Sequence, residues 1–310
     1  MNTEMAYLVG MVLGNGEIQH GSHKTTVTVD IPHKNLYTDD MKDVKVYVKA
    51  SITDIRSIVE PLTGRNLTVS QSDRSTMLTF ALDNCEYVAS EIVRLVERGS
   101  HHSTMRMHRD LFAMSMDEKK ALLRGIADTT GYIRRSNAAF GQDGGHRVYI
   151  EIPGNWFMVI DIANLLKTVD VPVHTIDFGH PNMRDGNLKK YKEGKRTFWK
   201  KEHQVKIWAN EFLPVGFNIA HKQEALEKYS EELLEYFDPD KTHKFYWEKP
   251  IHKKPRPFHP GETILHCLLK SAGSTSIHGL KLRRYLAMVH NVKKRIRAVR
   301  AHARLASKVS

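Results

Sequence analysis

Two short segments of this 310-residue chain place polar side chains where they could do chemistry. Residues 8–16 have the sequence LVGMVLGNG, and residues 123–131 have the sequence LRGIADTTG. Both are apolar and rich in small residues, as a buried helix would be, and both carry a polar residue next to the final glycine, Asn15 and Thr130. Chemistry at a hard cation such as Mg²⁺ needs carboxylates at such positions, because they bind the metal that activates water.

Both segments resemble the L-A-G-L-I-D-A-D-G helix of the LAGLIDADG homing endonucleases, a DNA-cleaving family. The resemblance implies that the second acid of each motif helps to hold a catalytic Mg²⁺, and here Asn15 and Thr130 stand at that position. Glu17 and Asp128 are the remaining candidate catalytic residues, and Asp128 is the candidate metal ligand. Each has a structural alternative, since Asp128 could hydrogen-bond locally at a helix end and Glu17 could face solvent from a strand. Mg²⁺ is therefore expected only if the protein is catalytic.

The spacing of the small residues predicts how the two motif helices pack. Gly10 and Gly14 are four residues apart and share one helical face, which lets another backbone approach closely. Gly125 and Thr129 hold the equivalent places in the second segment. We expect the two helices to lie side by side, to join two lobes, and to bring Asn15 close to Thr130.

Hydrophobic periodicity predicts the same order of elements in each half: helix, two strands, helix, two strands, helix. The first half has predicted helices at 5–14, 51–62 and 86–96, one predicted strand that begins at Glu17, and others at 25–31, 67–70 and 77–82. The second half has predicted helices from 116 into the motif, at 156–167 and at 213–237, and predicted strands at 132–135, 146–152, 173–178 and 204–208. The expected fold is α+β, a pseudo-symmetric two-lobed LAGLIDADG saddle of two αββαββα repeats with a basic helical C-terminal extension.

The repeats set the expected domain boundaries. The first lobe spans 1–98, residues 99–115 form the linker and the start of the second motif helix, and the second lobe spans 116–240. A basic extension covers 241–310. The family resemblance covers roughly residues 5–237 and does not reach the extension.

The net charge of +12 favours a polyanionic partner, and its distribution is uneven. Residues 241–310 contain 17 Lys and Arg against 2 Asp and Glu, which leaves residues 1–240 at a net charge of −3. Such a tail would add affinity without sequence information. From 280 to 305 it has an apolar stripe at three-four spacing, which could pair with a partner protein, dock on the body, or form one face of a phosphate-binding helix.

The second half presents most of the side chains suited to nucleic acid. On the predicted strands, alternate positions carry long polar side chains that match base-edge donor and acceptor patterns, whereas the first half is nearly neutral there. The connection between the last two strands is basic and interleaved with aromatic residues, as a phosphate-contacting loop requires. The predicted nucleic-acid-binding residues are Arg134, Arg147, Tyr149, Lys189, Lys190, Lys192, Lys195, Arg196, Lys200, Lys201, Gln204 and Lys206.

Other features of the sequence indicate the expected cellular location of the protein. No apolar stretch is long enough to cross a bilayer, and the N-terminus shows no export signal, so we expect an intracellular protein of the cytoplasm or nucleoid with no membrane partner. Cys85 and Cys267 provide neither a disulfide framework nor a zinc site.

The leading functional hypothesis is sequence-specific binding of double-stranded DNA with a degenerate metal site. An active homing or restriction-type endonuclease with an atypical site is one alternative. An RNA-binding protein, either maturase-like or part of a ribonucleoprotein, is another, although no RNA-recognition motif with paired aromatic residues is visible.

Overall fold

A computed structural model describes residues 1–40, 43–97, 99–135, 146–177 and 202–236. The first lobe consists of α1 (Thr3–Asn15), β1 (Gly16–His20), β2 (Lys24–Pro32), α2 (Val44–Thr63), β3 (Thr68–Gln71), β4 (Ser75–Asp83) and α3 (Tyr87–Leu95). The second consists of α4 (Met116–Thr130), β7 (Gly131–Arg134), β8 (Arg147–Pro153), α5 (Trp156–Thr168), β9 (Thr175–Asp177), β10 (Glu202–Trp208), α7 (Ala209–Phe212) and α8 (Ala220–Tyr236). Between the lobes, β5 (Val96–Glu97) pairs with β6 (Arg106–Met107), and the short helix η2 (Arg109–Phe112) follows.

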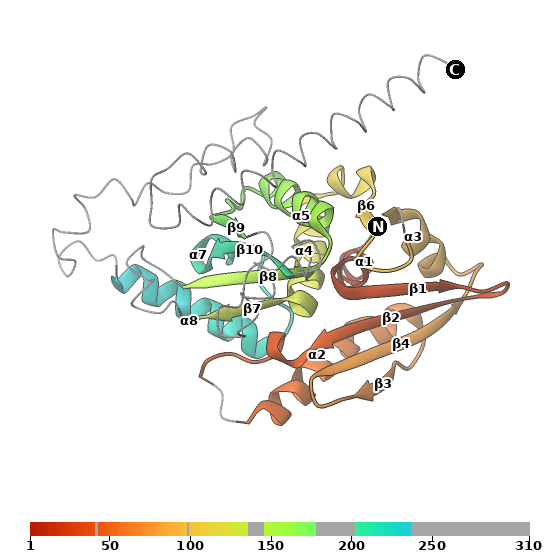
Figure 1. The fold of residues 1–310 in the computed structure, drawn as a ribbon, viewed down its shortest axis with the longest axis horizontal. Helices are drawn as coiled ribbons and strands as arrows, with labels where there is room; N and C mark the ends of the chain where they lie inside the picture. Colours follow the sequence, from red (N-terminus) through yellow and green to blue (C-terminus); the bar gives the residue numbers. More distant parts are fainter. Residues whose placement is uncertain (41–42, 98, 136–145, 178–201, 237–310) are drawn as a thin grey trace, which may run out of the picture. The chain divides into compact units, whose positions relative to one another are not determined.

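Each lobe is built on a four-stranded antiparallel sheet, and the two sheets have the same strand order (Figure 1). The order is β1-β2-β4-β3 in the first lobe and β7-β8-β10-β9 in the second. In both lobes the motif helix leads directly into the edge strand. The expected α+β class and the repeated order of elements are confirmed.

Two predicted helices have different bounds in the structure. The helix α2 begins at Val44 rather than at residue 51, because the Asp43 side chain accepts from the backbone N–H groups of Lys45 and Val46 and caps it there. The predicted helix over 213–237 is wrong in its first part. Pro214 and Gly216, which has a φ of 73°, lie between α7 and α8 and interrupt the helix.

The helices α1 and α4 pack along each other with their backbones in contact, as the small-residue spacing predicts (Figure 1). A Cβ atom built on Gly10 would overlap the carbonyl oxygen of Leu122, and one built on Gly125 would overlap the carbonyl oxygen of Tyr7. The two clashes are reciprocal, because Tyr7 and Leu122 hold equivalent places in the two motifs. Glycine is therefore required at both positions for this separation of the helices.

A segment of the first lobe, residues 33–40, attaches to the second lobe beside the helix pair. Asn35 donates from Nδ2 to the Thr129 carbonyl oxygen at 3.1 Å, and a ring nitrogen of His221 lies 2.7 Å from the carbonyl oxygen of Leu36. Asp40 forms an ion pair with Lys228 at 2.8 Å. The lobes are thus joined by polar contacts as well as by helix packing.

Side chains alternate in direction along each strand, so every second side chain points into the interior of its lobe. In β2 the inward residues Val27, Val29 and Ile31 are at most 1% exposed, and in the second lobe the inward residues of β8 and β10 are equally buried. His203 of β10 is one of these inward residues, with no exposed surface. No helix in the described part of the chain has both the length and the apolar character needed to span a bilayer.

Gly10 and Gly125, where α1 and α4 are in contact, give a stability prediction. The sign of the change in the free energy of unfolding distinguishes a close helix contact from an open helix. In an open helix, alanine is more stable than glycine by about 1 kcal/mol. We expect Gly10→Ala and Gly125→Ala instead to lower the free energy of unfolding by about 1–3 kcal/mol each, because a Cβ must displace the opposing backbone. Urea unfolding followed by circular dichroism measures this, and stabilisation by either variant would contradict the close helix contact.

The buried histidine gives a pH prediction. Burial lowers the pKa of His203 to about 4, whereas an unfolded histidine titrates near pH 6.5. Between these values the unfolded chain takes up a proton that the folded chain does not, so stability falls as the pH drops from about 6.5 to about 4, by up to about 3 kcal/mol. His203→Leu should make this part of the stability profile shallower but not flat, because burial also lowers the pKa of His102 and of His221. His23→Leu, at an exposed position, should leave the profile unchanged, and urea unfolding at a series of pH values measures both variants.

Candidate nucleic-acid interface

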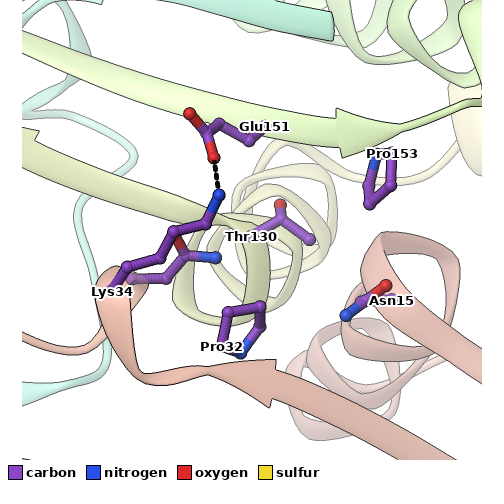
Figure 2. A pocket seen from close by; sticks show the side chains of 7 residues that line it. Asn15, Pro32, Lys34, Thr130, Glu151 and Pro153 are labelled. Carbon is purple, nitrogen blue, oxygen red and sulfur yellow. Dashed lines mark hydrogen bonds and ion pairs between the residues drawn. The ribbon is translucent and has the colours of Figure 1, made fainter. Parts of the chain in front are cut away.

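The ends of the two motif helices meet at a small pocket that contains residues of both lobes. Asn15 and Thr130 line it from the ends of α1 and α4, as the sequence predicts (Figure 2). The other lining residues come from the end of β2, from the segment after it, and from β8, and they are Pro32, Lys34, Asn35, Glu151 and Pro153. The cavity volume is about 20 Å³, which is the room of about one water molecule. We call this site the helix joint.

One ion pair spans the helix joint. The Lys34 ammonium of the first lobe donates to Oε2 of Glu151 in the second lobe at 2.6 Å (Figure 2). The other carboxylate oxygen, Oε1, accepts from the Tyr132 hydroxyl at 3.0 Å and from the Gln204 amide at 2.5 Å. Burial alone would raise the pKa of Glu151, but Lys34 and the two neutral donors outweigh it and hold the pKa below its usual value. Glu151 is therefore a buried, ionised and fully paired carboxylate.

The two residues at the motif positions are engaged in backbone contacts. Asn15, at 7% exposure, donates from Nδ2 to the carbonyl oxygen of Asp30 at 2.6 Å. Thr130 donates from its hydroxyl to the carbonyl oxygen of Ile126 at 2.6 Å, one turn earlier in its own helix. Glu17 lies on β1, where it accepts from Gln19 at 3.2 Å, and it is not among the residues that line the helix joint. Neither motif residue brings a charge to the joint.

Asp128 is part of a buried network on another side of α4. Its Oδ2 accepts from the Tyr7 hydroxyl at 2.9 Å and from the backbone N–H of Asn218 at 3.0 Å, and the side chain has no exposed surface. Lys222, also fully buried, lies 3.8 Å from Oδ1 and donates to two carbonyl oxygens, that of Ala127 in the last turn of α4 at 2.9 Å and that of Gly131 just after the helix at 2.8 Å. These contacts make Asp128 part of a structural network whose members lie far apart in the chain, rather than of a local hydrogen bond at the helix end.

Charges in this network depend on one another. Burial raises the pKa of Asp128, and the neighbouring ammonium opposes that rise. Burial also lowers the pKa of Lys222 to about 8, and Asp128 opposes that fall. Each charge is therefore tolerated in the interior because the other is present.

The residues at the helix joint do not fit the divalent metal that the family resemblance implies. Mg²⁺ requires carboxylate ligands, and the single carboxylate of the joint, Glu151, is already neutralised by Lys34. The positive ammonium would also repel a second cation in the same small cavity. Within the described ranges, no three His, Cys, Asp or Glu side chains come together in a way that could hold a metal ion.

Beside the joint, the outward face of the second sheet carries cationic groups over aromatic rings. Tyr132 and Tyr149 are stacked, with ring centroids 5.0 Å apart and an interplanar angle of 12°. The Arg134 guanidinium lies 4.7 Å from the Tyr132 ring centroid, and the Lys206 ammonium lies 5.6 Å from that of Tyr149. The strand register places these four residues in two neighbouring rows of one face.

A second arginine on this face is held in the same way. Arg147 lies 4.4 Å above the ring of Trp208, which is its register partner on β10. Gln204 has another role, because it is only 6% exposed and its amide donates to Glu151. Of the predicted contact residues on the strands, four are therefore half-buried on one face, Arg134, Arg147, Tyr149 and Lys206, whereas Gln204 supports the joint.

The equivalent face of the first sheet has a different composition. Its outward positions carry mostly short uncharged side chains, among them Thr26, Thr28, Thr68 and Thr79. The charged residues there are three carboxylates, Glu17, Asp30 and Asp83, and one cation, Lys24. The first face therefore lacks the cationic surplus of the second, as expected, but it is acidic rather than nearly neutral.

Several predictions concern residues outside the described ranges. They are the basic loop residues Lys189, Lys190, Lys192, Lys195, Arg196, Lys200 and Lys201, and the extension at 241–310 with its stripe over 280–305. Conversely, no pattern in the sequence indicated the Lys34–Glu151 pair. The two residues are 117 positions apart, and nothing local to Lys34 indicates a buried partner.

The sequence matches no protein-family model and no curated protein. Among solved structures, a single-residue variant of I-DmoI in complex with its target DNA is similar, at 14% identity and a TM-score of 0.39, over 71% of this chain and 96% of that chain. The LAGLIDADG homing endonuclease I-LtrWI bound to target DNA has 10% identity and a TM-score of 0.37, over 79% and 93%. Full-length WhiA from Thermatoga maritima has 11% identity and a TM-score of 0.41, over 75% and 60%. Because these sequence identities and TM-scores are low, the function must be argued from the chain's own residues.

The buried ion pair gives a stability prediction. Lys222→Met should lower the free energy of unfolding by about 3–5 kcal/mol, because it leaves Asp128 and the carbonyl oxygens at the end of α4 without their cation. Adding Asp128→Asn should restore part of that loss, since the uncompensated charge is then removed. Urea unfolding of the single and double variants measures both effects, and additive losses would contradict the coupling.

Proposed function

We propose that this protein binds duplex DNA with the outward face of its second sheet and that it has no divalent-metal centre at the helix joint. The observation that carries the proposal is the arrangement of Arg134, Arg147 and Lys206 on one sheet face, each over an aromatic ring. Arginine and lysine donors match the guanine edge in the major groove and also pair with phosphates.

The rings make these cations suitable for recognition. A long side chain loses rotamer freedom when it binds, and holding it over a ring before binding reduces that cost. The stacked pair Tyr132 and Tyr149 is itself fixed from below, because the Tyr132 hydroxyl donates to Glu151. The face is therefore preorganised by a network that begins at the helix joint.

Two-lobed organisation supports duplex DNA over a short single strand as the ligand. A pair of similar sheets joined by parallel motif helices offers two surfaces for one elongated, pseudo-symmetric ligand. The uneven charge of the two faces implies that the second lobe contributes most of the binding energy. The basic extension, by its composition, would add salt-sensitive affinity without sequence preference.

Selection from a randomised duplex library tests the proposal directly. Enriched sequence among retained molecules would support sequence-specific DNA binding, and fresh ends that cluster in Mg²⁺ would replace it with the endonuclease alternative. If structured RNA displaces the DNA at equal concentration, the result would favour the RNA-binding alternative over DNA binding. Enrichment in neither nucleic acid would remove the proposal.

Variants of the face should weaken binding to the selected duplex. We expect Arg147→Ala and Lys206→Ala to cost about 1–3 kcal/mol each, with relaxed specificity where they contact a base and uniform weakening where they contact phosphate. Arg56→Ala removes the same charge from α2, where Arg56 pairs with Glu60, and should leave the affinity unchanged. Fluorescence anisotropy measures the affinities, and equal losses in all three variants would show a non-specific charge effect.

A further inference from the structure

We propose that the Lys34 ammonium is the resident cation of the helix joint and takes the electrostatic place that a divalent metal would hold. The consequence is that the joint binds no divalent ion as long as Lys34 is present. A second consequence, which rests on the proposed DNA binding, is that the protein binds DNA equally well with and without divalent ions.

The first argument is the position of the charge. Lys34 reaches the pocket from the segment that follows β2, and its Nζ lies 2.6 Å from Oε2 of Glu151 (Figure 2). The Lys34 side chain is 40% exposed and that of Glu151 is 7% exposed, so the carboxylate is buried behind the ammonium. A cation at this place neutralises the only charged acceptor that lines the joint.

The second argument is the set of oxygens around it. The joint is lined by the carboxylate of Glu151, the amides of Asn15 and Asn35, and the hydroxyl of Thr130. Asn35 is 2% exposed, and its buried Oδ1 accepts no hydrogen bond from the described residues. This oxygen-rich lining would suit a hard cation if the ammonium were absent. Lys34 is therefore the one side chain of the joint that opposes a metal ion.

The third argument is the link to the proposed contact face. Glu151 accepts from both Tyr132 and Gln204, and Tyr132 supports Arg134 and Tyr149. Loss of the ammonium would leave a buried negative charge next to this face, where it would repel phosphate. The charge balance at Glu151 thus acts on nucleic-acid binding as well as on cation binding.

Terbium titration of the full chain tests the cation claim without DNA. Tb³⁺ is a hard cation whose luminescence is sensitised by nearby tyrosine, and Tyr132 contacts Glu151. We expect Lys34→Met to gain a Tb³⁺ site that binds about tenfold more tightly than any in the wild type, because a repelling unit charge has been removed. The double variant Lys34→Met with Glu151→Gln should lose that site, and the matched control Lys34→Arg, which keeps the positive charge, should not gain it.

Two outcomes would overturn the proposal. One is a folded Lys34→Met protein, judged by circular dichroism, that binds Tb³⁺ no better than the wild type does. The other needs no Lys34 variant: wild-type Tb³⁺ binding that disappears in Glu151→Gln would show that a metal already displaces Lys34. This second test remains decisive if Lys34→Met does not fold.

DNA binding supplies an independent readout. With the duplex obtained by selection, wild-type affinity should be the same in EDTA and in Mg²⁺ at matched ionic strength. Lys34→Met should bind about tenfold more weakly in EDTA and should recover in Ca²⁺. Wild-type affinity that requires Mg²⁺ would overturn the proposal, whereas a wild type that binds no DNA would remove the proposed function and leave the terbium result to decide the cation claim.

Discussion

The rest of the structure depends on the close contact of α1 and α4, where Gly10 faces the backbone of Leu122 and Gly125 faces that of Tyr7. Side chains larger than hydrogen would separate the helices at these points. That separation would move the edge strands, because β1 and β7 begin directly after the helices end. The contact therefore fixes the two sheets relative to each other and brings the ends of both helices to one pocket.

The buried carboxylates of the described residues share one property, which is that each has its own cationic partner; for Asp161 this partner is the Arg106 guanidinium. Glu151 pairs with Lys34 across the lobes, and Asp128 pairs with Lys222 between α4 and α8. Removing a carboxylate from water is costly unless a cation or several donors compensate it. A family-type metal centre would need acids left over for the metal, and the described joint has none to spare.

The two lobes share their topology and differ in the chemistry of their outward faces. Strand order is the same in both sheets, so the backbone presents equivalent surfaces. Short hydroxyl side chains occupy the first surface, whereas long cationic side chains over aromatic rings occupy the second. A duplicated scaffold can thus keep the same backbone geometry in both lobes and carry different side-chain chemistry on each outward face.

The sequence by itself determined the repeated α+β plan, the strand alternation and the glycine contact, because these follow from local periodicity and from side-chain size. Pro214 and Gly216 also indicated the break between α7 and α8, but the apolar pattern around them was interpreted as one continuous helix. Only the tertiary structure decided that Asp128 is buried against Lys222 and that Lys34 meets Glu151. Those pairs join residues far apart in the chain, and burial, which sets their charge state, is a property of the folded protein.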